Sequence, residues 1–157
     1  MSYPRSQAYR LLGLIALCGE LPADAIRRLP ISGSYRYKVI ASLKSQKLIR
    51  LFERDNLKGY RLTQAGKKLL LQVQPGRFSY YLDTGRLPGR SESARRRRLH
   101  AAAQAYITML NAGVPLFHDE KAPIFETPGP AAVPKPSGAV FYCPHEVKDI
   151  GLEANKI

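Results

Sequence analysis

With 157 residues the chain can hold one ordinary domain, and 25 Lys and Arg against 12 Asp and Glu give it a net charge of +13, which indicates a polyanionic partner. The first 74 residues carry 14 basic and 4 acidic side chains, whereas residues 100–157 carry 4 and 6. Two distant cysteines exclude a CxxC metal site and a disulfide framework, and no apolar run has the length of a signal or membrane span, so we expect a cytoplasmic protein without a membrane contact.

Three helices are predicted at the start of the chain. Apolar residues recur at helical spacing over 6–18, and Gly19 follows as a stop. A second helix of about two turns is expected after Pro22, before another proline ends it. A turn at 31–34 then leads into a third helix over 35–47. Helix, short helix, tight turn and helix is the order of a helix-turn-helix.

After the third helix, the helical spacing of apolar residues gives way to strand-forming residues. Strand-forming residues over 48–53 and 59–63 flank turn residues, which predicts a two-stranded hairpin. Thr63 is a suitable N-cap for a fourth helix over 64–73, and Gly66 would permit close packing of that helix. The expected fold class is therefore mainly α with a small β-hairpin.

The remainder of the chain divides into three segments. Residues 75–90 are expected to be a semi-ordered connector, and 91–113 a long amphipathic helix. Residues 114–157 hold a Pro-rich loop over 123–138, a strand over 139–143 and a short helix after it. The long helix is a candidate for homodimerisation, or it folds back on its own domain. Its apolar stripe comprises Leu99, Ala102, Tyr106, Met109 and Leu110.

Two groups of side chains are suited to contact double-stranded DNA. An α-helix reads base edges in the major groove, while basic groups hold the phosphates. The third helix and the hairpin tip carry such groups, although a solvated helix face and a charged hairpin edge are the ordinary alternatives. The candidate DNA-binding residues are Ser34, Tyr35, Arg36, Lys38 and Ser42 on the helix, and Arg54, Lys58 and Arg61 on the hairpin.

These motifs together resemble winged-helix transcriptional regulators. The similarity covers Ser34 to Leu43, Lys47 to Arg50, and Tyr60 to Leu70, where the final helix opens with Leu-Thr-x-x-Gly. The chain departs from the commonest pattern because Gln46-Lys47 replaces Glu-Gly before Leu48. The resemblance implies a winged helix-turn-helix over 6–74 that binds DNA without a cofactor.

The whole layout also resembles replication-relaxation proteins of plasmids and conjugative elements. The features that carry this resemblance are the run from Arg95 to His100, Asn111 to Val114, Phe141-Tyr142, and His145 to Lys148. It implies a role in replication or transfer of mobile-element DNA, beside a relaxase or replication protein. It also implies that the C-terminal domain is incomplete here.

The arginine run is interpreted in two ways. Arg95, Arg96, Arg97 and Arg98 cover all sides of one helical turn, so at least two of them must face outward as candidate phosphate contacts. The alternative is a solvated helix end whose arginine stems lie over nearby tyrosines.

No pattern of catalytic or metal-binding residues stands out, so we expect neither an enzyme nor a metal site. Glu146 and Lys148 have the Glu-x-Lys spacing of nucleases, but the sequence around them favours a helix rather than a strand. His118 to Glu120 is typical of a polar turn. A different class of function stays open, namely a protein-interaction adaptor in which the winged helix is only structural.

Overall fold

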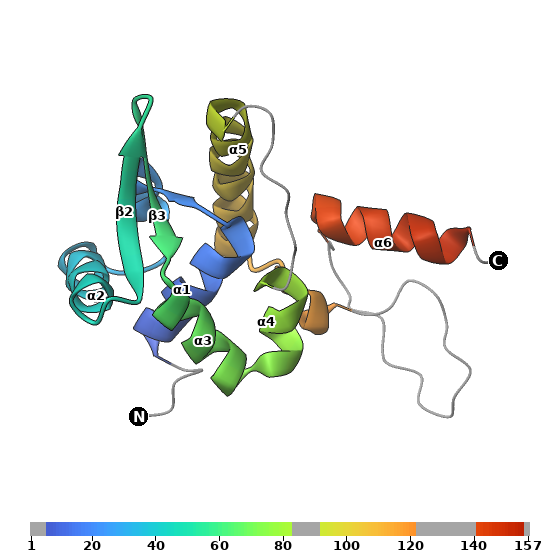
Figure 1. Cartoon of the computed structure of the whole chain (residues 1–157), viewed down its shortest axis with the longest axis horizontal. Helices are drawn as coiled ribbons and strands as arrows, with labels where there is room; N and C mark the ends of the chain where they lie inside the picture. Colours follow the sequence, from blue (N-terminus) through green and yellow to red (C-terminus); the bar gives the residue numbers. More distant parts are fainter. Residues whose placement is uncertain (1–5, 83–91, 122–140, 156–157) are drawn as a thin grey trace. The chain divides into compact units, whose positions relative to one another are not determined.

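The computed structural model describes residues 6–82, 92–121 and 141–155, which form a mainly helical protein with one small antiparallel sheet (Figure 1). The chain divides into two compact units, Met1–Thr108 and Met109–Ile157. The mainly α class predicted from the sequence is confirmed. Each unit is described by itself below.

Helix α1 (Gln7–Cys18) is the centre of the first unit. The Ser6 hydroxyl caps it by accepting a hydrogen bond from the Tyr9 amide at 3.1 Å, and Gly19 ends it with a φ of 76°. This helix is apolar on most of its circumference, and nearly all of its side chains from Leu11 onward are buried. Such a helix must be covered on several sides, which explains why the other elements of the unit gather around it.

The second predicted helix differs from the expectation. It is a 3-10 helix, η2 (Ala23–Arg28), and a two-residue strand, β1 (Leu21–Pro22), precedes it. Strand β1 pairs with the hairpin, and Leu29 is already extended again. Only the residues between them are therefore available for the helix. The 3-10 form rises further per residue than an α-helix and therefore spans the same distance with fewer residues.

Helix α2 (Gly33–Ser45) is the predicted third helix, and it begins and ends two residues earlier than expected. It packs through Val39, Ile40 and Leu43, as the apolar spacing predicts. Lys47 then turns the chain with a φ of 57°. The helix leads directly into the sheet.

The hairpin consists of β2 (Ile49–Arg54) and β3 (Leu57–Leu62), and β1 adds a third strand on the far side of β3. Asp55 and Asn56 form the turn with φ values of 54° and 60°, which suit a tight two-residue connection. The second strand therefore begins two residues before the predicted start at Gly59.

Helix α3 (Gln64–Val73) follows at once. Its cap residue Thr63 accepts from the Gly66 amide at 3.1 Å and donates to the Lys47 carbonyl oxygen at 2.6 Å. A Cβ atom at Gly66 would overlap the Leu48 carbonyl oxygen. The predicted close packing at this glycine is confirmed, because the Thr-x-x-Gly pattern brings the helix start against the end of the preceding turn.

The predicted connector is partly wrong, because its first half is helix α4 (Pro75–Leu82). Phe78 is buried and meets the Tyr9 ring edge to face at 6.4 Å, so α4 packs on α1 and α3 (Figure 1). The other half of the connector, 83–90, lies outside the described residues.

Helix α5 (Glu92–Asn111) confirms the predicted long helix. Its buried side differs from the expected stripe, because Arg96, Ala103, Tyr106 and Ile107 are buried while Leu99 and Ala102 are half-buried. Arg28 of η2 donates to Gln104 and, at 2.7 Å, to the Thr108 hydroxyl. Of the two alternatives for α5, the structure therefore has the helix folded back on its own unit, and this removes the argument for a dimer based on an unpartnered stripe.

The second unit holds η3 (His118–Glu120) and α6 (Pro144–Ala154). The helix predicted after Pro144 is confirmed. The strand expected over 139–143 is wrong in its described part, since 141–143 has no regular structure. The Pro-rich segment 123–138 lies outside the described residues.

Candidate nucleic-acid interface

One face of α2 presents polar and aromatic side chains to solvent. Ser34, Tyr35, Lys38 and Ser42 are all exposed, and 47% of the Tyr35 surface is accessible. The helix contains three basic residues and no acidic residue. Hydroxyl and ammonium groups on a helix without carboxylates are suited to contact base edges and phosphates.

Arg36 behaves differently from the rest of this predicted group. Its Nη2 donates to the Ile31 carbonyl oxygen at 2.9 Å, while its buried Nε has no hydrogen-bond partner. The guanidinium thus steadies the turn before α2 instead of extending from the helix. We therefore assign Arg36 to the local structure of this turn.

An aromatic group lies beside the same helix. Tyr37 is 65% exposed, and Leu51 of the hairpin, 40% exposed, is the cross-strand partner of Tyr60. Burial, together with the charge of Tyr37, raises the pKa of Tyr60. Tyr37 and Leu51 thus add exposed aromatic and apolar surface to α2 and to the hairpin.

Two basic side chains of the hairpin remain accessible. The Arg54 side chain is 67% exposed, with its Nε 4.0 Å from Asp55. The Lys58 side chain is 59% exposed and lies 3.5 Å from Glu53. Ion pairs at this exposure are worth about 0–1 kcal/mol. Both cations can therefore exchange these carboxylates for another anion at small cost.

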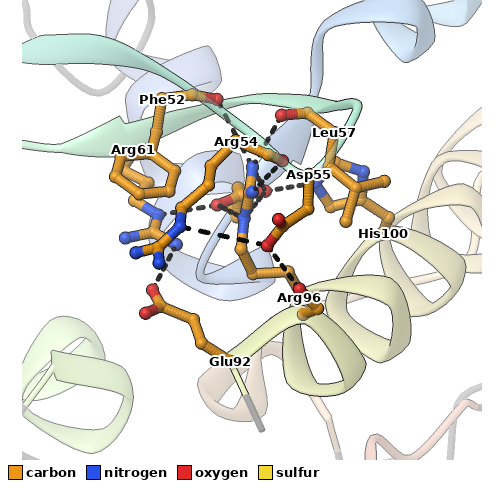
Figure 2. A network of polar contacts seen from close by, with 10 residues as sticks. Phe52, Arg54, Asp55, Leu57, Arg61, Glu92, Arg96 and His100 are labelled. Atoms are coloured by element: carbon orange, nitrogen blue, oxygen red, sulfur yellow. Dashed lines mark hydrogen bonds and ion pairs between the residues drawn. The ribbon is translucent and has the colours of Figure 1, made fainter.

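Arg61 occupies a different position on the hairpin. Its Nε donates to the carboxylate of Glu20 at 2.6 Å, and its Nη2 lies 3.4 Å from Glu92 of α5 (Figure 2). The guanidinium also stacks 4.0 Å above the Phe52 ring. Arg61 is thus engaged inside the protein, which corrects its predicted role as a phosphate contact.

Arg96 corrects the prediction for the arginine run more strongly. Its side chain is fully buried and points from α5 toward the turn of the hairpin (Figure 2). The guanidinium forms an ion pair with Glu20 at 3.1 Å and donates to three backbone carbonyls, those of Phe52, Arg54 and Leu57. Because the Arg96 side chain has no accessible surface and its hydrogen-bond donors are already in use, it cannot contact DNA.

Glu20 is the acidic centre of this network, and the sequence analysis did not single it out. Burial alone would raise the pKa of Glu20, but hydrogen bonds from Arg96, His100 and Arg61, and the charge of Arg61, outweigh burial and lower it. A Cβ atom at Gly59 would lie 2.5 Å from the Glu20 side chain, so this glycine makes room for the carboxylate. Glu20 follows the apolar run Leu11–Cys18 in a stretch without Lys or Arg, so no neighbour in the sequence signals its arginine partners.

The other members of the arginine run have separate environments. Arg97 and Arg98 are exposed, as a phosphate contact or a solvated helix end would require, and Arg95 is half-buried. Since Arg96 is enclosed and Arg95 is half-buried, the exposed side of this turn carries the guanidinium groups of Arg97 and Arg98. These arginines belong to α5 and therefore to a different helix from the candidate residues of α2.

The residues considered for nuclease chemistry do not converge. Glu146 is buried on α6, where it pairs with Lys121 at 2.5 Å and accepts from the Cys143 thiol at 3.2 Å. Lys148 is exposed, since residues two apart on a helix point in different directions. Within the described ranges, no group of three or more His, Cys, Asp or Glu side chains is placed to hold a metal ion.

Comparisons of the chain with protein-family models, with curated proteins and with solved structures give no match. Among the helices that the structure describes, none combines the length and the apolar character that a membrane span needs.

Proposed function

We propose that the protein binds double-stranded DNA, with residues 6–74 acting as a winged helix-turn-helix. Helix α2 enters the major groove and the tip of the β2–β3 hairpin holds the backbone. The observation that carries this proposal is the exposed face of α2, where Ser34, Tyr35, Lys38 and Ser42 lie without an acidic neighbour on the helix.

The hairpin supports the same function at a second place. Arg54 and Lys58 are exposed next to the turn, and each has only a solvent-exposed carboxylate nearby. Phosphate contacts of this kind add affinity without sequence preference, and they make binding dependent on salt. The net charge of +13 acts in the same direction by drawing the duplex to the protein.

The biological setting that we propose is regulation of transcription, or service to replication of a mobile element, in the cytoplasm. It is supported by the resemblance of the Leu62 to Gly66 motif to winged-helix regulators and of the Arg95 to His100 run to replication-relaxation proteins. A relaxase or replication protein is then a natural partner. DNA binding itself does not depend on this setting.

Variants of the two surfaces test the function. Arg54→Gln and Lys58→Gln should weaken binding to all duplexes alike and lower the salt slope by about one unit per lost contact. Tyr35→Ala and Lys38→Gln should instead erode discrimination between a preferred and a scrambled duplex, by roughly 1–3 kcal/mol where a base contact is lost. Binding of each variant is measured across a salt series.

Lys148→Gln is the matched control, because it removes one exposed charge from α6, outside both surfaces. It should leave site preference intact and change affinity only slightly. An α2 variant that folds normally and keeps the full site preference would contradict major-groove contact by this helix.

A protein-interaction adaptor is the second candidate, and one observation favours it. Tyr37 and Leu51 are exposed, and the latter pairs with Tyr60, so aromatic and apolar groups extend beside α2. Tyrosine is enriched where proteins bind one another. If neither set of variants alters DNA affinity while circular dichroism shows an intact fold, the adaptor becomes the better account.

A further inference from the structure

A hollow of about 360 Å³ lies in the first unit, on one side of the hairpin. Arg50 and Arg61 are cross-strand partners and contribute to its wall from the sheet. Because side chains alternate along a strand, these two residues project from the sheet face opposite to Leu51 and Tyr60. The hollow is therefore separate from the aromatic group beside α2, and the proposed DNA surface does not use it.

Four cations from four elements line this hollow. Besides Arg50 of β2 and Arg61 of β3, they are Lys67 of α3 and Arg95 of α5. Among the described residues that line it, none is Asp or Glu. Like charges that converge on a shared space repel one another, and an anion in that space would relieve the repulsion.

Three of the four cations have no carboxylate partner among the described residues. In the part of the chain that the structure describes, no ion pair joins Arg50, Lys67 or Arg95 to an acid. Glu20 balances Arg61, but its two oxygens are already taken by Arg61, Arg96 and His100. The described residues around the hollow thus leave the charges of Arg50, Lys67 and Arg95 uncompensated.

The remaining walls are apolar and aromatic. Ile15 of α1, Leu62 of β3 and Leu99 of α5 supply aliphatic surface, and Tyr81 of α4 supplies a ring. A bare inorganic anion would leave this surface unused. Small-molecule sites combine apolar walls with a few placed polar groups in volumes of roughly 300–1,000 Å³.

We propose that this hollow binds a small phosphate ester with a planar or apolar group, of the size of a mononucleotide. An arginine guanidinium can donate two parallel hydrogen bonds to the oxygens of one phosphate, and a lysine ammonium adds a compact positive charge. The phosphate lies among Arg50, Lys67 and Arg95, and the planar group lies against Tyr81 and Leu99. The proposal does not depend on DNA binding by α2.

Titration of the full chain with AMP tests it, with inorganic phosphate and adenosine as the two part-ligands. Calorimetry at fixed ionic strength should show saturable binding of AMP at one site per chain, weaker binding of phosphate, and no binding of adenosine. AMP should also raise the melting temperature of the protein by mass action. Absence of saturable binding of both AMP and phosphate would overturn the proposal.

Two double variants with equal loss of charge separate the site from general attraction. Lys67→Gln with Arg95→Gln removes two lining cations and should weaken AMP binding about tenfold or more, since each charge-assisted hydrogen bond contributes strongly. Lys68→Gln with Arg97→Gln removes the exposed neighbours of those residues and should leave the affinity unchanged. An equal loss in both pairs would overturn the assignment.

Stability of the lining variant gives an independent readout. Because Lys67→Gln and Arg95→Gln relieve repulsion and break no ion pair, this variant should melt at or above the temperature of the wild type without ligand. A short duplex is the last arm of the experiment. If the duplex displaces all bound AMP, the cations bind DNA phosphate and the proposal of a small-molecule site is overturned. Simultaneous binding of AMP and the duplex supports the proposal.

Discussion

Glu20 is a buried carboxylate between two arginine side chains, one of which is buried as well. Replacing it by Gln keeps the shape but leaves the Arg96 charge enclosed without a counter-ion. Breaking a buried pair in this way costs about 3–5 kcal/mol. We expect Glu20→Gln to lower the free energy of unfolding by this order in denaturant titrations. Glu53→Gln, which breaks an exposed pair, should cost about 1 kcal/mol or less, and equal effects would contradict the account.

The same carboxylate gives stability a defined pH dependence. The pKa of Glu20 is lower in the folded protein than its usual value of about 4.3, so the folded state binds this proton less readily than the unfolded chain. Its contribution is complete above about pH 4.3 and is lost as the pH falls through the lower folded value. Unfolding free energies measured on acidification should therefore decline more steeply for the wild type than for Glu20→Gln. Parallel curves would contradict a lowered pKa.

Two helical glycines should respond to alanine in opposite ways. Alanine is preferred to glycine in a helix by about 1 kcal/mol, and at Gly76, where a Cβ would meet nothing within 4 Å, the change should be neutral or stabilising. At Gly66 the new methyl group would overlap the backbone oxygen of Leu48, which cannot move away as a side chain could. Thermal melts should therefore show a loss for Gly66→Ala only, and a stabilised Gly66→Ala variant would exclude this close packing.

At the scale of elements, α5 holds the hairpin in place. Arg96 donates to the carbonyls of Arg54 and Leu57 on both sides of the turn, and Ser93 donates to Asp55 within the turn. We expect Arg96→Gln to speed hydrogen exchange of the hairpin amides, whereas the exposed neighbour Arg97→Gln should not. Unchanged protection in Arg96→Gln would show that the hairpin does not depend on this helix.

Elements with local causes could be predicted from the sequence. Helix α1 has a serine cap and a glycine stop, α3 has the Thr63 cap, and the hairpin has turn residues between two strand patterns. Strand β1 is only two residues long and exists because it pairs with β3, and no local period reveals such a partner. The 3-10 form of η2 follows from that pairing, so it was missed for the same reason.

The site was predictable to a similar extent. The exposure of Tyr35 and Lys38 follows from the apolar spacing of α2, because the buried residues fix the opposite face. The fate of Arg96 depends on Glu20, 76 positions earlier in the chain. Nothing in a run of four arginines shows which one forms an ion pair with a distant carboxylate. Which arginine is buried depends on how α5 packs against the rest of the unit.

At the scale of the whole molecule, each compact unit holds one buried cysteine. Burial raises the pKa of both thiols, Cys18 in the first unit and Cys143 in the second. Reaction with a thiol reagent therefore requires local opening. Among the described residues of the second unit the buried apolar side chains are Leu116 and Cys143, whereas α1 alone contributes more to the first. Cys143 should react faster than Cys18 in mass-spectrometric labelling, and the reverse order would contradict this difference in stability.

Over the whole chain, the net positive charge favours binding of any duplex, and the exposed face of α2 is the part that we propose selects among DNA sequences. The most direct measurement is selection of bound duplexes from a random pool, carried out with the wild type and with a variant in which Ser34, Tyr35 and Lys38 are replaced by alanine. We predict that the wild type enriches a defined motif at moderate salt and that the variant, with an intact fold, enriches none. Enrichment of the same motif by both proteins, or of no motif by the wild type, would contradict the claim.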